Sequence, residues 1–227
     1  MEWYAKTFQY WPFIVTGLRW TIEVSVLAMI FSSIIGLVAA LARLSGYRVV
    51  DAAVSIYVDF FRTTPLLVQL VWIYYALPIL SGYALTSVQA GVLGLSLYTG
   101  AFLTEIIRAG ILSVEREQRE ASLALGLTRA QTMRRIIIPQ AVMRMIPALT
   151  GVFMNLVKDS SLTSVIGVTE LMRQTQVLSS YMQRNMEPLI VAALIYFCLT
   201  YPLSLLSSYL QRRNGDERKA EASSHAI

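Results

Sequence analysis

Five long apolar stretches alternate with polar segments along the chain, and each is long enough to cross a membrane as a helix. They cover about residues 18–41, 51–80, 87–112, 141–167 and 188–213. The pattern predicts an all-α membrane protein with about five transmembrane helices. An odd number of spans places the two ends of the chain on opposite sides of the membrane.

The flanking segments differ from these stretches. Aromatic residues crowd positions 1–17, which is typical of a segment at the membrane interface. Residues 214–227 are polar and predict a disordered tail. The transmembrane domain is therefore expected over residues 18–213, with a polar loop at about 113–139.

Lysine and arginine are concentrated on one side of the predicted membrane. Two follow the first stretch, six lie within residues 113–146 and four lie in the tail, whereas the other side holds only Lys6, Arg19, Arg173 and Arg184. Because basic residues in short connections resist translocation, the polar loop and the tail are expected in the cytoplasm and the N-terminus outside. The net charge of +5 is thus explained by topology, without a nucleic-acid partner.

Composition excludes several classes of protein. Apolar residues make up 56% of the chain and charged residues 15%, against about 45–50% and 25% in soluble proteins, which leaves no separate soluble domain. The single Cys198 and the single His225 exclude an internal disulfide and a cysteine–histidine metal cluster. No lysine follows a glycine, so the chain has no Walker A loop. We therefore expect no catalytic residues, no metal and no cofactor bound by this chain.

Charged residues inside the apolar stretches are costly and mark candidate sites. Asp59 and Arg62 stand three apart and could neutralise each other on one helical face, and Glu105 and Arg108 repeat that spacing. Glu105 and Arg108 could alternatively only stiffen the region beside the polar loop. A second polar cluster follows in the fourth stretch, where the chain reads Asn155, Lys158, Asp159, Ser160 and Ser161.

The second apolar stretch contains a predicted helix start. Thr64 suits an N-cap and Pro65 a first helical residue. The exposed N–H groups of such a start could hold an amino acid carboxylate at membrane depth. The predicted substrate-binding residues are Asp59, Arg62, Thr63, Thr64, Asn155, Lys158, Asp159 and Ser160. The alternative is that Asp59 and Arg62 form an internal brace and Pro65 a kink.

The polar loop predicts a helix–turn–helix elbow. Good helix formers run to Leu125, Gly126 suits a left-handed cap, and Thr128 with Gln131 forms a capping box for a second helix. Pro139 is expected to restart the chain into the fourth span. Taken alone, this chemistry also fits a hairpin that merely joins two spans.

The spacing of the loop resembles the EAA loop of ABC-importer permeases. Glu120-Ala121-Ser122 is followed after three residues by Gly126, and after nine more by Ile136, with Ile138-Pro139 beyond. Ser122 replaces the second alanine and Ile138 replaces a leucine. Further segments are similar to the polar amino acid subfamily, namely residues 61–69, 105–111, 131–141 and 158–167.

The resemblance implies a type I ABC importer permease fold and a transport subunit of the bacterial inner membrane. Its coupling residues would be Glu120, Ala121, Ser122, Gly126 and Pro139. The implied partners are a cytosolic ATPase dimer carrying ATP and Mg²⁺, a second permease subunit, a soluble amino-acid-binding protein and a polar amino acid. Neither the particular amino acid nor the identity of the second permease follows from the sequence.

Three further residues and one departure refine this expectation. Glu170, Arg173 and Arg184 are candidate contacts for the binding protein. Val152 stands where relatives that grip a basic side chain are expected to carry an acid, which disfavours a cationic substrate. A channel or secondary transporter would explain the charges within the spans but not the spaced elbow. An intramembrane enzyme would need a catalytic constellation, and no such constellation can be read here.

Overall fold

The computed structural model describes the backbone of residues 10–224 and the side chains of residues 10–211. This part of the chain is helical throughout, without strands. The α-helices are α2 Trp11–Arg43, α3 Arg48–Thr63, α4 Leu66–Val71, α5 Leu77–Ser81, α6 Ser87–Leu112, α7 Arg116–Ala124, α8 Arg129–Thr132, α9 Ile138–Asp159, α10 Leu171–Met182 and α11 Met186–Ser224. Two π-helical turns, Trp72–Ala76 and Met133–Ile137, and a 3₁₀ helix, Ser160–Ile166, complete the set.

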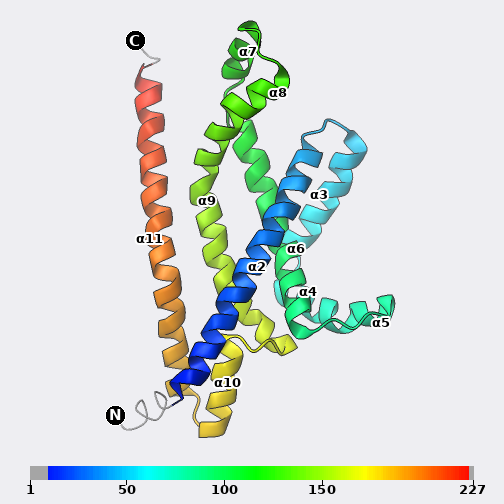
Figure 1. Ribbon diagram of the computed structural model, residues 1–227, viewed down its shortest axis with the longest axis vertical. Coiled ribbons are helices and arrows are strands. Elements are labelled where there is room, and N and C mark those ends of the chain that lie inside the picture. The colour runs from blue at the N-terminus through cyan, green and yellow to red at the C-terminus, as the bar shows by residue number, and fades with distance from the viewer. Residues whose placement is uncertain (1–9, 225–227) are drawn as a thin grey trace.

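Four long apolar helices are able to cross a membrane, and a bent pair provides a fifth crossing if it counts as one span. The bent pair is Arg48–Thr63 with Leu66–Ser81, whose axes differ by 106°. The predicted interruption near Pro65 is therefore a sharp break. Figure 1 shows α7 and α8 at one end of the bundle with the end of α11, and α10 at the opposite end near the start of α2.

The two π-helical turns explain why two prolines do not break their helices. Pro78 and Pro139 each lie two residues after such a turn, in which Leu77 N–H and Ile138 N–H each donate to the carbonyl five residues earlier. In the wider turn, the N–H group of the residue before proline donates five residues back, so the helix continues although proline has no N–H group. The sequence predicted that Pro139 would begin a new helix, but the helical run continues through it. Arg129–Ile166 forms one 38-residue helical run.

Helix ends also differ from the expected boundaries. Helix α2 begins at Trp11, inside the predicted interfacial segment, whose residues 1–9 lie outside the described part of the chain. Helix α11 continues to Ser224, so the backbone of the predicted tail is helical up to that residue. Strong helix formers after Asp216 account for the continuation.

Glycines allow α2 and α6 to pack closely. A Cβ atom on Gly36 would lie 2.6 Å from Leu103 Cβ, and one on Gly100 would lie 2.9 Å from Ile35 Cγ2. Neither separation leaves room for a side chain, so each glycine admits the facing helix. Small residues serve the same purpose where helices meet in membranes.

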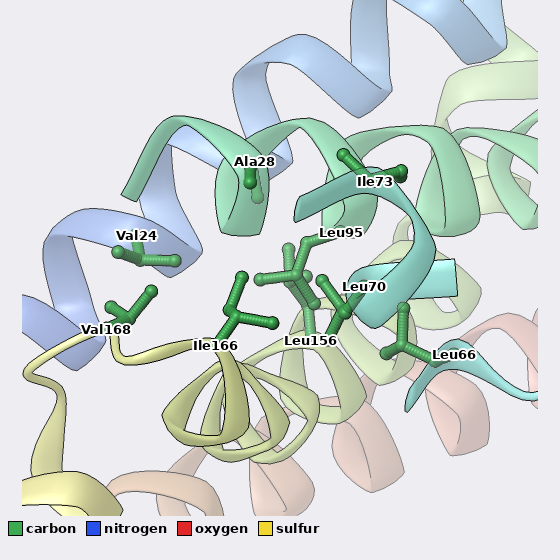
Figure 2. Close-up of a cluster of buried hydrophobic side chains, with 10 residues drawn as sticks. Val24, Ala28, Leu66, Leu70, Ile73, Leu95, Leu156, Ile166 and Val168 are labelled. Carbon is green, nitrogen blue, oxygen red and sulfur yellow. The ribbon is translucent and has the colours of Figure 1, made fainter. Parts of the chain in front are cut away.

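A cluster of buried apolar side chains joins the centre of the bundle. It gathers Val24 and Ala28 of α2, Leu95 of α6 and Leu156 of α9 around the short helix α4, which contributes Leu66 and Leu70 (Figure 2). The 3₁₀ helix adds Ile166 to the same cluster. Helix α4 is thereby fixed against the helices that line the cavity described next.

Candidate functional site

A cavity of about 390 Å³ lies between α6 and α9. It is lined by Tyr98, Thr99 and Phe102 of α6 and by Val152, Asn155, Leu156, Lys158 and Asp159 of α9. This volume falls in the range of small-molecule sites. The two helices thus form a pocket that has aromatic and apolar walls and that also contains the polar side chains of Asn155, Lys158 and Asp159.

The charged groups of the cavity have opposite signs. Lys158 and Asp159 are its only ionisable lining residues apart from Tyr98, and Asn155 adds an amide. A zwitterion carries one group of each sign, so this lining could bind both ends of one. Val152 and Leu156 offer no charge to a ligand side chain.

The predicted Asp59–Arg62 pair does not form among the described residues. Instead, the Arg62 guanidinium carbon lies 5.3 Å from the centroid of the Phe102 ring, a cation–π geometry. Arg62 therefore contacts a residue of the cavity wall, although it does not itself line the cavity. Asp59 is exposed on α3 and does not line the cavity.

The remaining predicted binding residues have hydroxyl groups bonded to nearby backbone. Thr63 Oγ1 donates to Asp59 O at 2.7 Å, and Ser160 Oγ donates to Val157 O at 2.8 Å. Thr64 Oγ1 donates to Phe60 O at 2.7 Å, and Thr64 ends α3 without capping α4. The N-cap prediction for Thr64 is wrong because Pro65 separates it from the new helix. Of the eight predicted residues, Asn155, Lys158 and Asp159 line the cavity.

The residues that α6 contributes to the cavity were not predicted from sequence. Tyr98 and Phe102 are four apart, so they share a helical face, and Thr99 lies beside them. This aromatic pair within a stretch rich in glycine and small residues was the available signal. It did not stand out because aromatic pairs are also common packing elements in cores.

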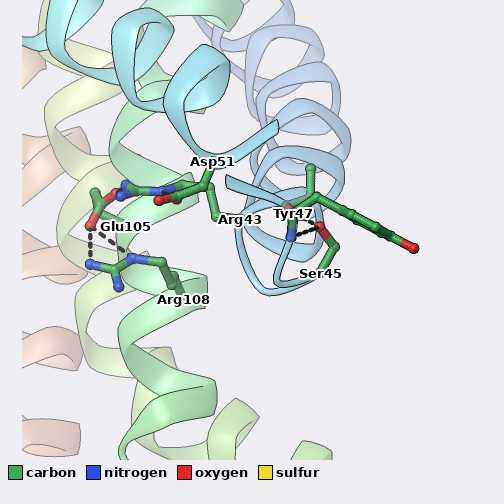
Figure 3. Close-up of polar contacts among 7 residues, drawn as sticks. Arg43, Ser45, Tyr47, Asp51, Glu105 and Arg108 are labelled. Atoms are coloured by element: carbon green, nitrogen blue, oxygen red, sulfur yellow. Dashed lines mark hydrogen bonds and ion pairs between the residues drawn. The ribbon is translucent and has the colours of Figure 1, made fainter. Parts of the chain in front are cut away.

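A cluster of four charges joins α2, α3 and α6 at the end of the bundle that carries the elbow (Figure 3). Arg108 Nη2 lies 3.0 Å from Glu105 Oε2, which confirms that pair. Arg43 Nη1 contacts Glu105 Oε1, and Arg43 Nε lies 2.9 Å from Asp51 Oδ1. Sequence spacing within one helix could not reveal Arg43 and Asp51, because they come from other helices.

The elbow has the predicted local geometry. Gly126 has φ +81°, and Thr128 with Gln131 makes both bonds of a capping box. Gly126 N–H donates to Leu123 O, and Leu127 N–H donates to Ser122 O, which closes the end of α7. The two short helices therefore meet at a defined turn.

Side-chain bonds join the two arms of the elbow and hold the polar loop to α9. Ser122 Oγ lies 2.9 Å from Thr132 Oγ1, and both side chains are buried. Gln140 Nε2 donates to Gln118 Oε1 at 2.6 Å, and Arg144 donates to the Ser113 carbonyl. Serine in place of the second alanine thus adds a bond between the two arms of the elbow.

The other motif residues differ in exposure. Glu120 pairs with Arg116 on the solvent side of α7, with 2.8 Å between Oε1 and Nε, and its carboxylate does not cap the elbow. Ala121 is also exposed. The outer face of α7 therefore presents Glu120 and Ala121 to the surroundings.

At the opposite end, Glu170 is fully buried and caps α10. Its carboxylate accepts bonds from Met172 N–H at 2.8 Å, Arg173 N–H at 2.7 Å and the Tyr196 hydroxyl at 2.8 Å. The sequence suggested Glu170 as a contact for the binding protein, but its burial prevents such a contact. Arg173 is exposed, and Arg184 pairs with Glu187 at 3.3 Å.

Stability should depend on the ionisation of Glu170. Burial raises the pKa of its carboxyl above the ordinary 4.5, against the opposing effect of the three hydrogen bonds. The folded protein then binds this proton more tightly than the unfolded protein, so its contribution to stability is present below 4.5 and is lost as pH rises through the raised pKa. Between pH 4 and about 8, the thermal unfolding midpoint should decrease less with rising pH for Glu170→Gln than for the wild type. An equal decrease in both proteins would contradict a raised pKa for Glu170.

No group of three or more metal-ligating side chains occurs among the residues that the structure describes.

A bundle of apolar helices around a cavity with one positive and one negative side chain, with a braced elbow at one end, defines a membrane transport subunit. The chain belongs to the family of binding-protein-dependent transport system inner membrane components, whose model matches residues 32–216. This membership confirms the resemblance drawn from the EAA spacing. The chain is a permease subunit and not an ATPase.

Similar proteins cover nearly the whole chain. The L-cystine transport system permease protein TcyB of Bacillus subtilis is 40% identical over 208 residues, covering 90% of this chain and 87% of TcyB. A putative glutamine transport system permease protein GlnP of Rickettsia bellii is 38% identical over 201 residues, covering 88% and 92%. A crystal structure of an amino acid ABC transporter with histidines is 38% identical with a TM-score of 0.86, covering 92% and 98%. The type I importer fold is thereby confirmed.

Proposed function

We propose that this permease imports a polar amino acid across the bacterial inner membrane by alternating access. The cavity between α6 and α9 carries this proposal, because its two charged lining residues match the two charges of an amino acid. The names of the relatives support the same substrate class, since they refer to cystine and glutamine. Asp159 would hold the α-ammonium group and Lys158 the α-carboxylate.

The proposed substrate has an uncharged side chain. Tyr98, Phe102 and Val152 surround the rest of the cavity and provide no second charge pair. A buried charge without a partner is costly, so a cationic or anionic side chain would bind weakly there. Arg62 lies against the Phe102 ring and would add positive potential near the carboxylate.

Two ATPase subunits binding ATP and Mg²⁺ would supply the energy, and the elbow would contact them. The exposed outer face of α7 and the bonds that join the polar loop to α9 support this assignment. A helix held at both ends can transmit a displacement to the spans. A second permease copy or homologue and a soluble amino-acid-binding protein would complete the transporter.

The proposed orientation has the elbow and C-terminus in the cytoplasm and the N-terminus outside. It rests on the basic residues of the loop and tail, which resist translocation. Helix α10 then lies at the outer side, where exposed Arg173 could meet the binding protein.

The test is transport in proteoliposomes that contain the permease, its ATPase and its binding protein. Uptake of a neutral polar amino acid should require ATP, and Gly126→Ala should lower ATPase binding about tenfold, because a left-handed residue other than glycine costs about 1–2 kcal/mol. Gly151→Ala is the matched control, since a Cβ atom meets open space at both positions but only Gly126 has positive φ. Uptake driven by an ion gradient without the ATPase would contradict the proposal.

A further inference from the structure

The break between α3 and α4 leaves backbone groups without helical partners. Helix α3 ends at Thr63, and both Thr64 and Pro65 are extended, with ψ of 142° and 131°. The last carbonyls of a helix have no partner within it, and proline cannot supply an N–H group. Away from water, such groups must be satisfied by the protein itself.

The side chain of Gln69 fills this need from within α4. It is only 6% exposed, and its Nε2 lies 3.1 Å from both Phe61 O and Thr64 O. The same nitrogen lies 2.6 Å from Thr64 Oγ1, whose hydroxyl donates in turn to Phe60 O at 2.7 Å. One amide therefore closes the carbonyl end of α3 from the far side of a 106° bend.

The amide of Gln69 acts at the bend through its Nε2 donors and not through its oxygen. Gln69 Oε1 is buried and has no hydrogen-bond partner among the described residues. A buried acceptor without a partner is destabilising, so this orientation persists because the bonds made by Nε2 outweigh that loss. A glutamate here would place a carboxylate against carbonyl oxygens.

Gln69 lies between contacts that reach the cavity wall and contacts that reach the charge cluster. Its neighbours Leu66 and Leu70 pack in the same cluster as Leu156, which lines the cavity (Figure 2). At the start of α3, Asp51 pairs with Arg43 in the charge cluster beside the elbow (Figure 3). The bent pair thus connects the charge cluster with the cavity wall.

We propose that Gln69 is a positioning residue that fixes the angle between α3 and α4, so that a displacement of α3 moves α4 against the cavity. Its effect on transport rests on the proposed function, whereas its effect on the bend does not. Two separate measurements therefore test the two parts.

The first measurement is the distance between spin labels on the two arms of the bend. Ile56→Cys on α3 and Ile79→Cys on α5 are exposed sites, and Cys198→Ser removes the native thiol. Gln69→Met keeps the size of the side chain and removes its donors, so it should broaden the distance distribution in the assembled transporter. Gln176→Met on α10 is the matched control and should leave the distribution narrow.

The second measurement is amino acid uptake by the same variants in proteoliposomes. Gln69→Met should lower kcat about tenfold with little change in KM, because the substrate groups are untouched. Gln69→Glu should lower it further. If Gln69→Met does not assemble, Thr64→Val removes one acceptor and should show the same broadening to a smaller degree.

The outcomes separate the two ideas. A narrow distribution in Gln69→Met, or in Thr64→Val where the first variant does not assemble, overturns the positioning role. A broad distribution with unchanged kcat overturns the link to transport. If the wild-type complex shows no ATP-driven uptake, the proposed function is wrong, and the distance measurement still decides the role of Gln69 at the bend.

Discussion

Glu105→Ala is expected to lower the free energy of unfolding by about 3 kcal/mol, the largest stability change that we predict for a single side chain. Glu105 contacts Arg43 through one carboxylate oxygen and Arg108 through the other. The side chains are 23% exposed for Glu105 and 16% for Arg43, so water compensates little when the carboxylate is removed. Arg108 then loses its carboxylate partner, and Arg43 keeps only Asp51.

Glu120→Ala provides the matched control for this prediction. Glu120 also pairs with an arginine on its own helix, with 2.8 Å between Oε1 and Arg116 Nε, but it lies outside the spans and the Arg116 side chain is 86% exposed. An exposed pair contributes about 0–1 kcal/mol. Thermal or chemical unfolding of the two purified variants should therefore separate clearly. Similar midpoints for both would show that the charge cluster does not hold α2, α3 and α6 together.

Asp159→Asn is expected to reduce amino acid uptake by about 30-fold or more in the reconstituted transporter. The substitution keeps the shape of the side chain and removes the negative charge proposed to hold the α-ammonium group. Removing one partner of a close charge pair costs about 2 kcal/mol or more, which corresponds to a loss of this size. The initial rate of uptake against substrate concentration gives kcat/KM directly.

Ser161→Ala is the control for Asp159→Asn. Ser161 lies two residues further on and donates its hydroxyl to Lys158 O at 2.7 Å, outside the cavity lining. It should keep uptake near the wild-type rate. Full uptake by Asp159→Asn, with normal assembly, would remove Asp159 from the proposed site and leave Asn155 to be tested in the same way.

Features set by a few adjacent residues could be predicted from sequence. The elbow is the clearest case, because the left-handed turn at Gly126 and the capping box of Thr128 and Gln131 depend on residues within one or two turns. The break near Pro65 was predicted for the same reason. Turns and caps of this kind depend on neighbouring residues and not on contacts between helices.

Features set by contacts between helices could not be predicted in the same way. Helical spacing suggested that Arg62 pairs with Asp59, but Arg62 lies against Phe102, forty residues later. Glu170 looked like a surface acid, yet it is buried and accepts bonds from two N–H groups of α10 and from Tyr196 of α11. Three of the eight residues that line the cavity come from α6, and the sequence does not state which helix faces α9.

The glycine contacts between α2 and α6 limit how these helices can move. Sliding either helix by one residue would bring a Cβ atom to the place of Gly36 or Gly100, where none fits. The pair is therefore unable to change register during a transport cycle without first separating. We expect that inward and outward openings arise by tilting other helices around this pair, which would serve as the stationary axis of the subunit.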